Sequence, residues 1–318
     1  MRLLYSFIIG YLWVFFIIGN VNAESPKPFV PSEIKKVTLD VNTMYQQMDG
    51  FGASDCWRFQ FVGKNWPLEK REKIADLLFS QELDERGNPK GIGLSVWRFN
   101  IGAGSMEQGS GSNISDEWRR TECFLNADGS YNWTKQEGQL WFMMAAKKRG
   151  VERLLGFTNS PPVYYTKNGK AYSPGGYQLN LKQGYIARFA EFLTTVCQHF
   201  KEVGLPLDYL SPVNEPQWDW KAGKDSTTSQ EGSPASNADI AELTRNLSSG
   251  LAQKNLSTQV VVGEAGSIAY LYSNSDVKRG TQVEDFLILL LLITLEIFQM
   301  CIKSSADIAI LPFGLSPD

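Results

Sequence analysis

Ser211-Pro212-Val213-Asn214-Glu215-Pro216 is the stretch of the sequence that decides the fold. It directly follows residues 207–210, which predict a buried strand, and Pro216 ends that strand and fixes the turn after it. An acidic residue at the carboxyl end of a barrel strand occupies the position where barrel enzymes carry out their chemistry. Glu215 is therefore a candidate catalytic residue. The alternative is a solvated glutamate in a loop, because Asn-Glu-Pro is a short motif that chance matches easily.

Strand patterns and amphipathic helical patterns alternate along the chain, as they do in parallel α/β sheets. Strands are expected at residues 37–41, 93–101, 154–157, 207–210 and 260–262, with a Gly-rich turn at 50–54. Helices are expected over 67–79, from a capping box at 134–137 to Gly150, around His199 up to Gly204, and from the cap Ser236 to 251. This order predicts an α/β fold of the (β/α)8 TIM-barrel type, incomplete here, with about five units. An open doubly wound sheet is the alternative, although no phosphate-binding glycine motif follows any strand.

Residues 1–23 are expected to form a secretory signal peptide. Arg2 precedes a long apolar run, and Val21-Asn22-Ala23 fits a small-residue cleavage site. The alternative is an uncleaved membrane anchor, because the run approaches the length of a membrane span. We therefore expect a secreted or periplasmic protein. Residues 24–45 would form an extended segment with a strand of a small β side domain, and residues 46–286 a partial barrel domain.

Charge and rare residues exclude several classes of function. The formal net charge is −3, and without a basic excess a nucleic-acid partner is not expected. His199 is the single histidine and lies within a helical pattern, so it is assigned a structural role and a His-based triad is excluded. The cysteines show no Cys-x-x-Cys spacing and predict no metal site, while their pairing stays open: Cys56, Cys123, Cys197 and Cys301. We expect no cofactor and no stable membrane partner.

Four motifs follow the expected strands in a fixed order. They are Asp49-Gly50-Phe51-Gly52-Ala53-Ser54, Trp97-Arg98-Phe99-Asn100-Ile101-Gly102, Asn159-Ser160-Pro161-Pro162 and Asn214-Glu215-Pro216-Gln217-Trp218. Each is weak alone, but four in order at strand ends are specific. Together, over residues 34–286, they resemble glycoside hydrolase family 30, and in particular its branch similar to endo-β-1,6-galactanases.

This resemblance implies an O-glycosyl hydrolase that uses two carboxylates in a retaining double displacement. Glu215 matches the general acid/base, and Asn214 would hold the sugar 2-hydroxyl. Arg98 would support the acid/base electrostatically, with a plain structural ion pair as the alternative. Asn159 would line the sugar site at the scissile bond. Trp218 and Trp220 would stack on sugar rings, although packing is an alternative role. The partner is a polysaccharide or oligosaccharide, with β-1,6-galactan implied by the branch and β-glucosides or β-xylan by the wider family.

The sequence departs from the family in one respect that bears on catalysis. The family places its nucleophilic glutamate at the end of the seventh strand, and no sixth, seventh or eighth unit is recognisable here. Glu264 follows the fifth strand and matches the family's fifth-strand turn, so it is expected to be a sugar-binding or structural residue rather than the nucleophile. The stretch 230–233 is expected to line the cleft.

The resemblance stops after Phe286, where an apolar tail at 287–318 begins. In another reading frame the genetic code permits a polar segment and a strand ending in Gly-His-Ser-Tyr-Phe, so our hypothesis is a frameshift near the codon for Phe286. The chain as written is then expected to be inactive. Two alternatives are a non-catalytic carbohydrate-binding remnant and a protein anchored in a membrane by residues 287–298.

Overall fold

The computed structural model describes residues 40, 42, 44 and 49–266. The chain divides into two units, Met1–Met48 and Asp49–Asp318, and the fold below is that of the described part of the second unit. The predicted signal peptide at 1–23, nearly all of the segment 24–45 and the tail at 287–318 lie outside the described residues. Among the residues that are described, no helix is both long and apolar enough to cross a membrane.

Five parallel strands form one sheet in which every strand pairs with the next strand in the sequence. They are β1 (Gly52–Ser54), β2 (Val96–Asn100), β3 (Arg153–Phe157), β4 (Tyr209–Ser211) and β5 (Gln259–Val260). Each connection carries at least one helix, as the barrel prediction requires. The strand order never reverses, which argues against the doubly wound alternative, because that fold needs a reversal point.

The Gly-rich stretch is a strand and not the predicted turn. Gly52–Ser54 forms β1, in register with β2 so that Gly52 lies beside Val96 and Ser54 beside Arg98. A Cβ at Gly52 would lie 2.7 Å from the Val96 side chain and carbonyl oxygen, so glycine lets the two backbones approach closely. The prediction was wrong because glycine in a strand interior signals either a turn or a close approach.

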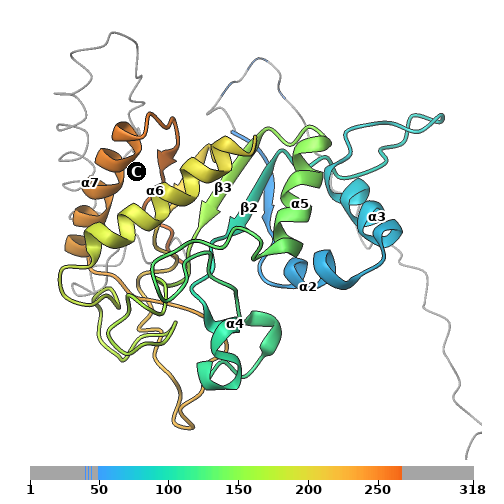
Figure 1. Cartoon of the computed structure of the whole chain (residues 1–318). Helices are drawn as coiled ribbons and strands as arrows, with labels where there is room; N and C mark the ends of the chain where they lie inside the picture. The colour runs from blue at the N-terminus through green and yellow to red at the C-terminus, as the bar shows by residue number, and fades with distance from the viewer. Residues whose placement is uncertain (1–39, 41, 43, 45–48, 267–318) are drawn as a thin grey trace, which may run out of the picture. The chain divides into compact units, whose positions relative to one another are not determined.

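Six α-helices and two short 3₁₀ helices accompany the sheet within residues 49–266 (Figure 1). They are α2 (Arg58–Asn65), α3 (Leu68–Phe79), α4 (Ser105–Gln108), η1 (Gly109–Ser112), η2 (Glu117–Arg119), α5 (Glu137–Lys148), α6 (Ile186–Glu202) and α7 (Asn237–Gln253). Helix α6 packs beside α7, and α5 packs against α2 and α3. The predicted helices correspond to α3, α5, α6 and α7, whereas α2 was not predicted.

Two details of the predicted helices were wrong. In α5 the predicted capping box does not form, because the Thr134 hydroxyl donates to Asn132 Oδ1 at 2.7 Å instead. The amides of Gly138 and Gln139 donate to Gln60 Oε1 of α2 at 3.0 and 3.1 Å, so a neighbouring helix provides the cap. In α3, the spacing of Ile74, Leu77 and Leu78 predicts that all three lie on one apolar face, but Leu77 is 62% exposed.

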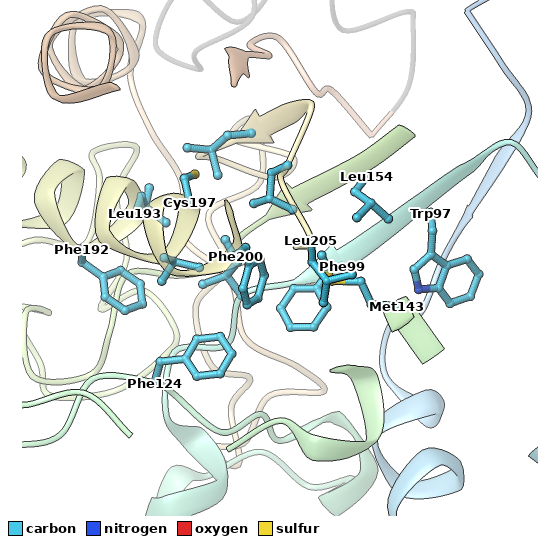
Figure 2. Close-up of a cluster of buried hydrophobic side chains, with 14 of the residues drawn as sticks. Trp97, Phe99, Phe124, Met143, Leu154, Phe192, Leu193, Cys197, Phe200 and Leu205 are labelled. Carbon is cyan, nitrogen blue, oxygen red and sulfur yellow. The ribbon is translucent and has the colours of Figure 1, made fainter. Parts of the chain in front are cut away.

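The hydrophobic core lies between the sheet and its helices (Figure 2). Trp97 and Phe99 of β2 are fully buried, and Phe99 meets Phe200 of α6 edge to face with ring centroids 5.2 Å apart. His199 stacks on Trp133 at 3.8 Å and 7°, and burial lowers the pKa of its imidazole. This packing is in keeping with the structural role expected for the histidine.

Candidate active site

The predicted site residues converge on the edge of the sheet where the strands end. Arg98 belongs to β2, Asn159 follows β3, Asn214 and Glu215 follow β4, and Glu264 follows β5. Parallel strands present their carboxyl ends on the same side, so residues far apart in the sequence meet there.

Arg98 is the centre of this group. Its Nη2 donates to Asn214 Oδ1 at 2.8 Å and to both carboxylate oxygens of Glu264 at 3.1 Å. The guanidinium also lies over the ring of Phe157, 3.2 Å from its centroid. Arg98 thus makes the ion pair weighed as its alternative role. It also acts on the acid/base candidate, because burial raises the pKa of Glu215 and the charge of Arg98 offsets part of that rise.

Asn214 and Asn159 form a chain of amide hydrogen bonds. Because Arg98 has only donors, it requires the Asn214 oxygen to face it, and this turns Asn214 Nδ2 toward Asn159 Oδ1 at 3.1 Å. Asn159 Nδ2 lies 3.4 Å from Asn100 Oδ1 and 4.0 Å from Cys56 Sγ. Asn159 is only 3% exposed, so it contacts Asn214 from the buried side of the site.

Glu215 has an unusual backbone that fixes the direction of its carboxyl group. Its φ is +47°, in the left-handed region that non-glycine residues rarely adopt. Its amide donates to the Glu264 carbonyl at 2.9 Å, and its own carbonyl accepts from Trp220 Nε1 at 2.9 Å. Strained residues of this kind cluster at functional sites, where surrounding bonds hold them in place.

The surroundings of Glu215 favour the protonated form of its carboxyl group. Burial is the main cause that raises its pKa, Arg98 lowers it, and the negative charge of Glu264 raises it again. The Glu215 carboxyl group lies close to the backbone of Gly266, since a Cβ on Gly266 would lie 2.6 Å from Glu215 Oε1. A half-buried glutamate with a raised pKa is better suited to donating a proton than a fully solvated glutamate.

Glu264 is held by the protein through both carboxylate oxygens. Arg98 donates to each of them, and Ser211 Oγ donates to Oε2. The side chain is 24% exposed. Of the two roles expected for Glu264, this arrangement favours the structural one, since its oxygens are already engaged.

The two tryptophans after Glu215 differ in their surroundings. Trp218 is 40% exposed beside the acid/base candidate, where an aromatic face can meet a sugar ring. Trp220 instead bonds the Glu215 carbonyl and covers Gly232 so closely that no Cβ fits there. Trp220 therefore packs, which was the alternative role considered for it.

Sequence reasoning missed Asp55 and Cys56, which follow β1. Asp55 is fully buried, and its Oδ1 accepts from the Asn100 amide at 3.3 Å. Burial raises the pKa of the Asp55 carboxyl, and it also raises the pKa of the Cys56 thiol, which keeps the sulfur neutral. Their position directly after the glycine-rich stretch could have indicated them, but that stretch was predicted to be a turn rather than a strand.

Glu231 does not line the cleft as predicted for the stretch 230–233. It is fully buried, where it accepts from the Ala103 amide at 3.1 Å and from the Ser105 amide at 3.2 Å. Ser105 Oγ donates to it as well, at 2.5 Å. Glu231 therefore ties the loop after β4 to the loop after β2, and burial raises its pKa to about 7.

The parallel strands, with polar and charged side chains gathered at their carboxyl ends, define a barrel-type α/β protein. The chain belongs to glycoside hydrolase family 30, because the model of O-glycosyl hydrolase family 30 matches residues 34–289.

Solved structures are also similar to this chain. A conserved exported protein from Bacteroides fragilis is 43% identical with a TM-score of 0.72, over 76% of this chain and 48% of that one. The catalytic domain of GH30 xylanase C from Talaromyces cellulolyticus is 20% identical with a TM-score of 0.53, over 72% and 49%. An endo-β1,6-glucanase is 17% identical with a TM-score of 0.53, over 71% and 46%. The last two show the fold alone, and the chain spans about half the length of each structure.

Proposed function

We propose that this protein is an exported glycosidase that acts on a β-linked polysaccharide, with Glu215 as its general acid/base. The observation that carries the proposal is the Glu215 carboxyl at the end of β4, half-buried, with a pKa raised by burial. Membership of family 30 supports the reaction class. β-1,6-Galactan is the substrate we put forward, on the motif resemblance in the sequence.

The neighbours of Glu215 take roles that suit this reaction. Glu215 would protonate the leaving oxygen and then activate a water molecule. Asn214 would hold the sugar 2-hydroxyl, with Arg98 and Asn159 fixing the direction of its amide. Trp218, the exposed aromatic beside the carboxyl, would stack on a sugar ring.

Retention also requires a second carboxylate about 5–5.5 Å from the acid/base. Within residues 49–266 the carboxylate that influences the pKa of Glu215 is Glu264, and Arg98 and Ser211 hold it. This engagement favours a second candidate function for the chain as written, namely binding of the polysaccharide without turnover. The reading-frame hypothesis at Phe286 belongs with the first candidate, the glycosidase, and resequencing the DNA across that codon tests it.

Export through a signal peptide at 1–23 is part of the proposal. It draws support from the relative described as an exported protein, which is 43% identical. Amino-terminal sequencing of the secreted product tests it, with cleavage after Ala23 as the expected result.

Hydrolysis and binding assays on the full chain separate the two candidates. Reducing ends released from β-1,6-galactan are measured for the unchanged chain, for Glu215→Gln and for the surface control Glu242→Gln. A glycosidase releases reducing ends, and Glu215→Gln reduces the rate by about 10²–10⁴-fold, as loss of a general acid/base does. Calorimetric binding of galactan with no release by any variant supports the binding function. If the chain neither binds galactan nor releases reducing ends from it, both candidate functions are contradicted.

A further inference from the structure

A second pocket with aromatic walls lies apart from Glu215. It has a volume of about 290 Å³ and is bordered by α2, η2 and the methionine of α4. Its apolar lining consists of Trp57, Phe61, Met106 and Trp118, and polar groups such as Asn65 and Glu117 stand at its border. An aromatic wall with a few polar groups is the usual composition of a small-ligand pocket.

The pocket lies on the same side of the sheet as the candidate active site. Figure 1 shows α2 and α4 on the side toward which the arrowheads of β2 and β3 point. Trp57, which lines the pocket, directly follows Cys56, and Cys56 Sγ is 4.0 Å from Asn159 Nδ2 in the candidate active site. One wall of the pocket therefore follows directly in the chain from a residue that contacts the candidate active site.

The aromatic wall is held in place before any ligand arrives. Phe61 and Trp118 stack with ring centroids 4.1 Å apart at 27°. Arg58 lies 4.8 Å from the ring centroid of Trp118 and pairs with Asp116 at 3.2 Å. Phe61 nevertheless stays 40% exposed, so part of its ring remains open to solvent. A preorganised aromatic surface binds with little loss of side-chain entropy.

We propose that this pocket is a distal subsite that binds one sugar residue of the polysaccharide, away from the bond that is cleaved at Glu215. The inference rests on the proposed function, since it takes the same substrate. A sugar ring offers apolar C–H faces to an aromatic ring and hydroxyl groups to polar side chains. Charges of both signs border the pocket, Lys64 and Arg120 beside Glu117 and Glu122, so it favours a neutral ligand over an ion. Its volume is near the lower limit of ligand pockets, roughly 300 Å³, which suits a single ring.

Binding of oligosaccharides of two lengths tests the subsite. The probes are the β-1,6-linked disaccharide and hexasaccharide of galactose, titrated calorimetrically into the full chain. We expect the hexasaccharide to bind the unchanged chain more tightly. Phe61→Ala is expected to weaken hexasaccharide binding at least about fivefold, the loss typical of a truncated aromatic anchor, and to leave disaccharide binding unchanged.

Two further variants guard against a folding defect. Phe61→Leu keeps an apolar side chain but removes the aromatic face, and the same loss is expected. Trp66→Ala removes an aromatic residue that is 40% exposed just after the same helix but does not line the pocket, and no loss is expected.

The outcomes separate this inference from the proposed function. If the disaccharide binds and Asn214→Ala weakens it, while both Phe61 variants bind the hexasaccharide normally, the subsite is wrong and the proposed function stands. If neither probe binds the unchanged chain, the proposed substrate and the subsite are both wrong.

Discussion

Arg98 of β2 donates to both carboxylate oxygens of Glu264 at 3.1 Å, across a separation of 166 residues in the sequence. The pair joins the second strand of the sheet to the turn after the fifth, and the two side chains are only 22% and 24% exposed. The Arg98–Glu264 pair therefore holds the two strand ends together at the candidate site and places one positive and one negative charge there.

Arg98→Ala is expected to lower the free energy of unfolding by about 1–3 kcal/mol, because it leaves the Glu264 carboxylate partly buried without its partner. Denaturant titration measures the loss. The double variant Arg98→Ala/Glu264→Ala should lose less than the sum of the single variants, since the two residues interact directly. Strict additivity would contradict the coupling.

Glu215 is expected to make stability depend on pH. Burial raises its pKa above the ordinary value of 4.5, so folding favours the protonated carboxyl. Its contribution is present below the unfolded pKa and is lost as the pH rises through the folded pKa. From pH 4 to pH 7 the free energy of unfolding of the unchanged chain should therefore fall relative to that of Glu215→Gln. A difference that is independent of pH would contradict the raised pKa.

Glu231 should make stability depend on pH in the same direction and over a wider pH range, because burial raises its pKa from 4.5 to about 7. The stabilisation is complete below about pH 4.5 and is lost as the pH rises through about 7. Other charges near this region are Glu107 and Lys135, which act with Glu231 on Cys123. Glu231→Gln places an amide donor against the Ala103 or Ser105 amide, so it should cost about 1–3 kcal/mol at low pH. It should also flatten the pH dependence, and an unchanged slope would contradict this assignment.

Gly52→Ala is expected to destabilise the protein by about 1–3 kcal/mol, because the new methyl group would press on Val96 in the neighbouring strand. Gly111→Ala is the matched control, since nothing lies within 4 Å of a Cβ there. Thermal unfolding of both variants checks the close approach of β1 and β2. Equal melting temperatures would show that β1 does not need glycine.

The sequence predicts the fold well where periodicity is strong. Helices α6 and α7 carry regular apolar spacings, and the apolar residues at these spacings, such as Phe189 and Leu247, are buried. Strands β2 to β5 are short segments followed by turns, and each was located to within a few residues. Strand β1 was missed because glycine carries no side-chain pattern, and α2 because its start has no side-chain cap.

The candidate site could be predicted in part. Arg98, Asn159, Asn214 and Glu264 meet because strand ends converge, which follows from topology alone. The engagement of Glu264 by Arg98 and Ser211 could not be derived, since it depends on side-chain geometry. Buried Glu231 was misplaced because a charged residue in a polar loop is normally expected at the surface.

The central claim is that Glu215 is the acid/base of a glycosidase site. The most direct test incubates the full chain with β-1,6-linked galactose oligosaccharides, with and without formate as a small carboxylate that can stand in for a nucleophile, and measures cleavage by mass spectrometry. The proposed role of Glu215 predicts cleavage with formate and little or none without it, and the cleavage with formate should fall about 10²–10⁴-fold in Glu215→Gln. Cleavage that proceeds equally in Glu215→Gln would contradict it, and so would an absence of cleavage under both conditions.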